Sequence, residues 1–66
     1  MDVSKIKALF ISGLCDEIPE DVVDKKDCEE LYSGFQKDMK AARCRCKHAR
    51  IRQSWINKFL KKFKNN

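Results

Sequence analysis

The chain has 66 residues, 38% of them charged, and a formal net charge of +5 at pH 7. At this length folding buries only about 60% of the surface that the unfolded chain exposes, so a hydrophobic core alone gives marginal stability and cross-links are expected. No segment approaches the roughly 20 apolar residues that a bilayer-spanning helix needs. The sequence therefore predicts a single small helical domain over residues 1–66.

The charge is unevenly distributed along the chain. Residues 1–36 carry four lysines and nine acidic residues, a net charge of −5, whereas residues 37–66 carry eleven Lys and Arg and one acidic residue, a net charge of +10. Such a cationic half favours an anionic partner: phospholipid, nucleic acid or an acidic protein surface. Alternatively, the acidic half neutralises the basic half in the folded protein.

The first predicted helix covers residues 3–14. Apolar residues recur there at spacings of three and four, on one helical face: Val3, Ile6, Phe10 and Leu14. The run also has the outline of a signal peptide, but its apolar part is short and is interrupted by Ser12. We interpret it as the first helix of the mature domain, from which any export signal has already been removed.

The second predicted helix covers residues 19–47, with a possible break at residues 33–34. Pro19 followed by two acidic residues is typical of a helix start. At 100° per residue, an arc of about 100° then holds the cleanest apolar face in the sequence: Cys28, Leu31, Tyr32, Phe35, Met39, Ala42 and Cys46. Ser33-Gly34 is the one candidate break in this face.

The third predicted helix covers residues 49–63. Its apolar residues occupy an arc of roughly 140°, and lysines and other polar residues fill the remainder: Trp55, Ile56, Phe59, Leu60 and Phe63 form the apolar side. The chain has only two glycines and one proline and no alternating pattern of useful length. The predicted fold is therefore all-α: a small three-helix, disulfide-braced bundle, or a helical hairpin plus an extra helix.

Disulfide bonds are predicted at Cys15, Cys28, Cys44 and Cys46. Bonded cysteines have Cα atoms within about 7 Å, whereas a continuous helix from residue 28 to residue 44 would separate them by about 24 Å. Either the chain folds back near Gly34, or Cys28 bonds to Cys15 and leaves Cys44 and Cys46 together in a strained ring. We favour the first option, in which Cys15 and Cys28 each bond to one of the other two cysteines, in either connectivity. The continuous apolar face conflicts with it.

Two other interpretations of the cysteines remain. A zinc site that also uses His48 has enough ligands, but the spacings of twelve, fifteen and one residues do not match the usual knuckles. Reduced thiols of an intracellular protein are the second. His48 has no nearby carboxylate to orient it, and the chain has no phosphate-binding glycine loop, paired-carboxylate site or redox C-x-x-C motif. We predict no enzyme, no catalytic residue, no metal and no cofactor.

The C-terminal helix resembles an interfacial helix, with lysines segregated opposite aromatic residues. The predicted contacts with a membrane or another anionic partner are Arg50, Arg52, Trp55, Lys58, Phe59, Lys61, Lys62, Phe63 and Lys64. Alternatively, these aromatic side chains are core, because a three-helix protein of this size needs every apolar face that it has. The sequence leaves both interpretations open.

Together these features predict a secreted, cationic, disulfide-stabilised helical peptide that acts on membranes or membrane proteins, as a toxin or an antimicrobial host-defence effector. In composition alone the chain resembles small venom and defence peptides, and no motif carries that resemblance. The alternative is a small basic regulator in the cytoplasm that binds nucleic acid or an acidic protein surface.

Overall fold

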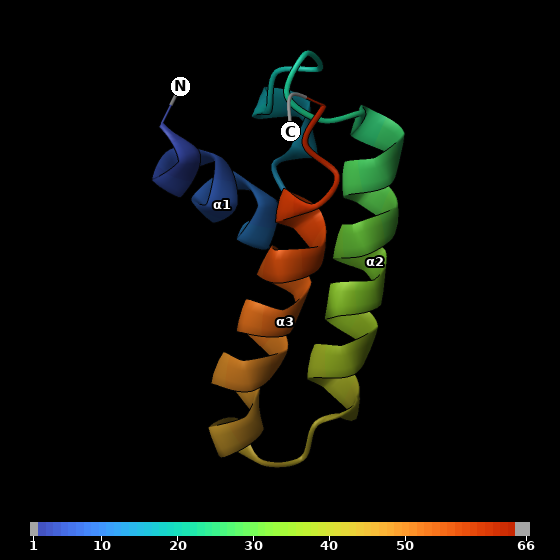
Figure 1. Cartoon of the computed structure of the whole chain (residues 1–66). Helices are drawn as coiled ribbons and strands as arrows, with labels where there is room; N and C mark the ends of the chain where they lie inside the picture. The colour runs from blue at the N-terminus through green and yellow to red at the C-terminus, as the bar shows by residue number, and fades with distance from the viewer. Residues whose placement is uncertain (1, 65–66) are drawn as a thin grey trace.

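The computed structural model describes residues 2–64, so residues 1, 65 and 66 of the predicted domain lie outside it (Figure 1). It contains three α-helices, α1 (Val3–Ile11), α2 (Lys25–Ala41) and α3 (His48–Leu60), and two short 3-10 helices, η1 (Cys15–Glu17) and η2 (Arg45–Lys47). No strand occurs between residues 2 and 64. The predicted all-α, three-helix architecture is confirmed. Helices α2 and α3 form an antiparallel hairpin, and α1 lies across one end of it.

Helix α1 ends three residues before its predicted end. Its start is capped by Asp2, whose Oδ1 accepts a hydrogen bond of 3.2 Å from the Ser4 N–H. Its end is a Schellman motif, in which the Leu14 N–H donates to the Leu9 carbonyl and Gly13 has a φ of +77°. Only glycine adopts this left-handed conformation without strain, so Gly13 fixes the point at which the chain leaves α1.

Helix α2 is shorter than predicted at both ends. Residues 18–24 form turns instead of a helical start, and they bury Ile18 and Val23 in the core, at 5% and 1% exposure. At the other end Ala42 is extended, with a ψ of 122°, and the chain reverses before residue 47. The free energy gained by burying Ile18 and Val23 outweighs the preference of Pro19 for the first turn of a helix.

The predicted break at residues 33–34 is wrong, because α2 runs unbroken through Gly34. The glycine is required for packing. A Cβ added there would overlap the Trp55 ring at Cη2 and lie 3.0 Å from its Cζ3. The absence of a side chain at Gly34 therefore lets the indole of α3 lie directly on the backbone of α2.

The core is centred on two phenylalanines. Phe10 of α1 and Phe59 of α3 are both fully buried, and their rings are stacked with centroids 4.4 Å apart and an interplanar angle of 8°. From α2, Phe35 and Tyr32 meet the same Phe10 ring at 6.2 and 6.3 Å. All three helices therefore meet at one aromatic cluster.

Two ion pairs fasten the segments next to α2. The Lys64 ammonium lies 2.6 Å from Asp24, and the Lys64 N–H donates to the Val22 carbonyl at 2.8 Å. The Lys25 ammonium lies 2.5 Å from Asp16 of η1. In each pair the hydrogen bond to the aspartate raises the pKa of the lysine. Acidic and basic ends of the chain thus meet here, at the end of the bundle that carries α1.

We expect Gly34→Ala to destabilise the protein by about 1–3 kcal/mol, because the added methyl group displaces the Trp55 ring from α2. On an open helix face the same change stabilises a helix by about 0.5–1 kcal/mol, so the sign of the effect is diagnostic. The measurement is the free energy of unfolding in urea, with Ser33→Ala at the neighbouring exposed position as control. A Gly34→Ala protein at least as stable as the parent would contradict the packing of Trp55 on α2.

Candidate functional site

The connection between α2 and α3 forms one tip of the molecule (Figure 1), which measures 36 × 19 × 18 Å. Residues 42–44 are irregular and lead into η2, where the Lys47 N–H donates to the Cys44 carbonyl at 3.1 Å. Helix α3 continues directly from η2 at His48. The short connection presents successive side chains to solvent rather than to the core, and Cys44, Arg45, Cys46 and Lys47 are all exposed.

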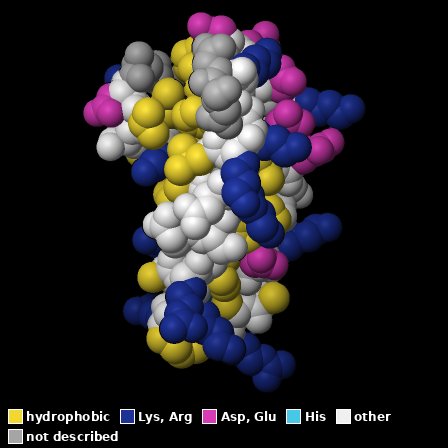
Figure 2. Space-filling view, in the orientation of Figure 1, with side chains coloured by type: hydrophobic (Ala, Val, Ile, Leu, Met, Phe, Trp, Pro, Cys, Tyr) yellow, Lys and Arg dark blue, Asp and Glu magenta, His cyan; other side chains and the backbone are white. Residues whose placement is uncertain are grey.

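Exposed cations follow one another from this tip along α3. Eight are exposed and have no carboxylate at ion-pair distance within residues 2–64: Arg43, Arg45, Lys47, Arg50, Arg52, Lys58, Lys61 and Lys62. We call the first four of them, which lie within residues 43–50, the cationic tip. No acidic residue follows Asp38 in the sequence. Figure 2 shows Lys and Arg at this end and most acidic side chains of the face drawn gathered toward the opposite end, with one acidic side chain between them.

The predicted contact set is divided by the structure. Arg50 belongs to the cationic tip; Arg52 and Lys58 lie exposed on α3, Lys61 and Lys62 lie exposed just beyond its end, and Lys64 is paired with Asp24. The set does not include Arg43, Arg45 and Lys47, because it follows the amphipathic pattern of residues 49–63. The density of cations in the sequence, taken without any helical pattern, is the signal that would have identified them.

Trp55 is half-buried and joins α2 to α3. Its Nε1–H donates a hydrogen bond of 2.7 Å to Oδ2 of Asp38, and the Lys58 ammonium lies 4.1 Å from the ring centroid. With Gly34 beneath the ring, the indole is held on three sides. It acts as a packing residue in this structure rather than as a free membrane anchor.

The other two predicted aromatic anchors are also packed against protein. Phe59 is fully buried, which contradicts its prediction as a contact residue, and Phe63 is half-buried and lies edge-on against it with centroids 5.3 Å apart. The alternative interpretation, in which these side chains are core, therefore describes the folded protein. The cations are the part of the predicted contact set that remains at the surface.

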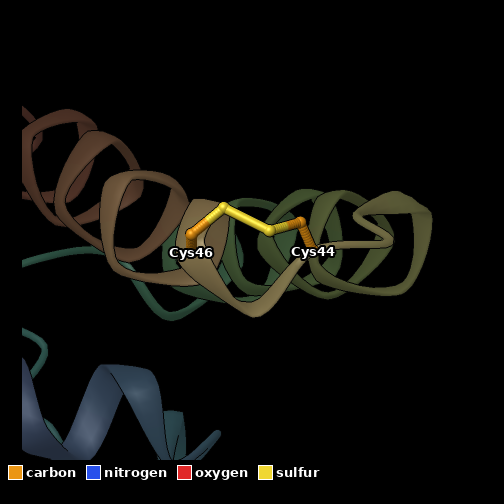
Figure 3. Close-up of a disulfide and its surroundings, with 2 residues drawn as sticks. All are labelled: Cys44 and Cys46. Carbon is orange, nitrogen blue, oxygen red and sulfur yellow. A yellow bond between two sulfur atoms is a disulfide. The ribbon is translucent and has the colours of Figure 1, made fainter.

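The cysteines are paired differently from the favoured prediction. Cys44 and Cys46 form a disulfide with each other, with Cα atoms 5.3 Å apart (Figure 3). Because α2 is continuous from Lys25 to Ala41, Cys28 near its start is separated by about 20 Å along the helix axis from Ala41 at its end, three residues before Cys44. The favoured connectivity, in which Cys15 and Cys28 are each bonded to one of Cys44 and Cys46, is wrong for that reason.

The Cys44–Cys46 bond closes a ring of three residues within one turn of chain, so it joins neither helix to another element. Chain-entropy arithmetic gives about 1.6 kcal/mol for a loop of this length, against about 3 kcal/mol for a loop of 14 residues such as Cys15 to Cys28 would close. The hairpin is held by the Trp55 and phenylalanine contacts described above. The disulfide is therefore a minor contributor to stability.

Cys15 and Cys28 lie at the other end of α2, with free thiols whose sulfur atoms are 2.6 Å apart. Both are buried, at 7% and 0% exposure. Burial, and then the hydrogen bond to Cys15, raises the pKa of the Cys28 thiol.

The structure does not assemble the zinc site considered from the sequence. Its ligands would have to come from both ends of α2, and within residues 2–64 no three His, Cys, Asp or Glu side chains converge. His48 is half-buried, with Nε2 lacking a hydrogen-bond partner there.

Two open surface pockets flank α2. The larger, about 480 Å³, lies between η1 and α2 and has a mixed polar lining that includes Asp16, Tyr32 and Lys40. The smaller, about 290 Å³, has an apolar floor with Phe35 and Met39 and is bordered by Lys40 and Arg52. Neither lining combines a nucleophile with a base in hydrogen-bond reach, so the exposed cations and the cysteine pairs are the chemically distinctive features.

Under reducing conditions we expect the protein to lose stability as the pH rises above about 9. The Cys28 thiol ionises near 9.0 in the unfolded chain, whereas its raised pKa keeps it protonated in the folded protein. Its contribution is therefore complete below pH 9 and falls above it, by up to about 1.4 kcal/mol per pH unit. Urea unfolding at pH 7.5 to 10 measures this, with Cys28→Ala as control. Identical pH slopes for the two proteins would contradict the burial of the thiol.

No helix within the described residues has the length and apolar character needed to cross a membrane. Comparison of the chain with models of protein families, with curated proteins and with solved structures finds no match.

Proposed function

We propose that this protein is a secreted, cationic, disulfide-containing helical protein that binds anionic membrane surfaces, in the manner of a toxin or an antimicrobial host-defence effector. The observation that carries the proposal is the cationic tip: four exposed cations within eight residues, without a carboxylate at ion-pair distance in the described part of the chain. Phosphate groups of anionic lipids are the complementary partner for such a surface.

The separation of charge within the molecule supports contact through the tip. The molecule is 36 Å long, and acidic residues gather at the end opposite the tip. At physiological ionic strength charges interact over about 8 Å, so the acidic end does not cancel the field at the tip. Neutralisation between the two halves is confined to pairs such as Lys64 with Asp24.

The expected strength of binding follows from the number of cations. Each Lys or Arg close to an anionic leaflet contributes about 1 kcal/mol, so the four tip residues supply about 4 kcal/mol. Because Phe59 is buried and Trp55 is held between the two helices, the folded protein binds at the level of the headgroups without inserting aromatic rings. The interaction is therefore electrostatic and sensitive to salt.

The alternative is a basic intracellular regulator that binds nucleic acid or an acidic protein surface. It differs from the membrane proposal in the state expected for Cys15 and Cys28, whose sulfur atoms lie 2.6 Å apart: reduced thiols in a reducing compartment, a disulfide after secretion. The oxidation state of the natural protein separates the two functions. Alkylation in denaturant without prior reduction, followed by intact mass, labels Cys15 and Cys28 if the protein is intracellular and leaves them unlabelled if they are oxidised to a second disulfide on secretion.

We expect the protein to bind vesicles containing 30% anionic phospholipid and not to bind neutral vesicles at the same ionic strength. The triple variant Arg43→Gln/Arg45→Gln/Lys47→Gln should weaken binding at least tenfold, because it removes three charges at the tip. The matched control Lys5→Gln/Lys7→Gln/Lys26→Gln removes three exposed or half-exposed charges elsewhere and should change binding less than twofold. Sedimentation with vesicles measures the bound fraction.

Four outcomes would count against the membrane proposal. Equal binding to neutral and anionic vesicles would remove its electrostatic basis, and equal loss in the two triple variants would remove the tip as the contact surface. Tighter binding of a short oligonucleotide than of anionic vesicles, at the same salt concentration, would favour the nucleic-acid alternative. Binding that rises with salt would exclude both phosphate-bearing partners.

A further inference from the structure

The two cysteine pairs of this chain occupy opposite environments. Cys15 and Cys28 are buried at one end of α2, whereas Cys44 and Cys46 are bonded to each other and exposed at the tip (Figure 3). The buried pair is shielded from reagents, and burial disfavours the thiolate that would react. The exposed pair is open to attack and serves little in holding the fold. A role other than stabilisation is therefore open to it.

The surroundings of the exposed pair favour thiolate chemistry. Arg45 lies between the two cysteines in sequence, Arg43 precedes them and Lys47 follows them, and all three are exposed. Adjacent cations stabilise a thiolate, and a stabilised thiolate is a better leaving group when another thiol attacks the disulfide. Within residues 2–64 no carboxylate lies at ion-pair distance from these three cations.

We propose that the Cys44–Cys46 disulfide is a thiol–disulfide exchange site that selects small thiols of negative charge, such as glutathione. The same cations that stabilise the leaving thiolate attract an anionic thiol to the bond, so charge supplies both reactivity and selectivity. This inference concerns a reaction of the tip and does not depend on membrane binding.

The reaction proceeds in two balanced steps. The thiolate of one glutathione attacks Sγ of one cysteine; the bond between Cys44 and Cys46 breaks, a mixed disulfide forms, and the other cysteine leaves as a thiolate that takes a proton from water. The thiolate of a second glutathione attacks the mixed disulfide, releases oxidised glutathione and leaves the second cysteine as a thiolate, which is also protonated. Two electrons pass from the two glutathiones to the protein. Oxidised glutathione regenerates the protein disulfide by the reverse steps.

The experiment uses the full chain, oxidised with oxidised glutathione, and follows reduction by acid quenching, alkylation and intact mass. Glutathione, which carries a net negative charge, is compared with cysteamine, which is positively charged. We expect Arg43→Gln/Arg45→Gln/Lys47→Gln to slow reduction by glutathione about tenfold while reduction by cysteamine is unchanged or faster. Because each rate is compared with that of the parent for the same thiol, differences in intrinsic thiol reactivity cancel.

Two control proteins complete the test. Lys5→Gln/Lys7→Gln/Lys26→Gln should react with both thiols within twofold of the parent, and Cys44→Ser/Cys46→Ser should lose the fast reaction while keeping its helical circular dichroism. The proposal is overturned if the tip variant affects both thiols equally, if the parent shows no reduction, or if no bond between Cys44 and Cys46 forms in oxidised glutathione. Loss of helical structure on reduction would also overturn it, because the bond would then be structural.

Discussion

The stacked contact between Phe10 and Phe59 is the interaction on which the rest of the structure depends. It joins the first helix to the last, and Phe35 and Tyr32 of α2 meet the same ring. In a chain of 66 residues only a small core is available, so burying these aromatic rings is a large part of the stabilisation. The turns of residues 18–24, which bury Ile18 and Val23, complete this core.

Because the aromatic side of α3 lies in the core, charged side chains are the main functional groups at the surface. Trp55 is enclosed by Gly34, Asp38 and Lys58, and Phe59 has no exposed surface. The exposed cations of the tip then lie at one end of a helical hairpin whose long axis separates them from the acidic end. Both functions proposed for the tip, attraction of anionic surfaces and reaction with anionic thiols, use this arrangement.

The continuity of α2 gives the four cysteines two different roles. An unbroken helix of 17 residues places Cys28 at one end of the hairpin and Cys44 just beyond the other, so neither can reach the other. The pair at the start of α2 is enclosed by the core, and the pair beyond its end is exposed beside arginines and lysine. The same chemical group is thus shielded at one end of the molecule and open to reaction at the other.

The sequence by itself determined the three helices, the uneven charge and the inward face of α2 at Cys28 and Phe35, because periodicity and charge are local properties of the chain. It also predicted that α3 has an apolar side, but only the tertiary structure decided that Phe59 lies in the core. Tertiary contacts likewise decided that residues 18–24 form turns, that Gly34 accommodates Trp55, and that Cys46 is exposed and bonded to its neighbour. These outcomes depend on distances between residues far apart in the sequence, which helical periodicity cannot specify.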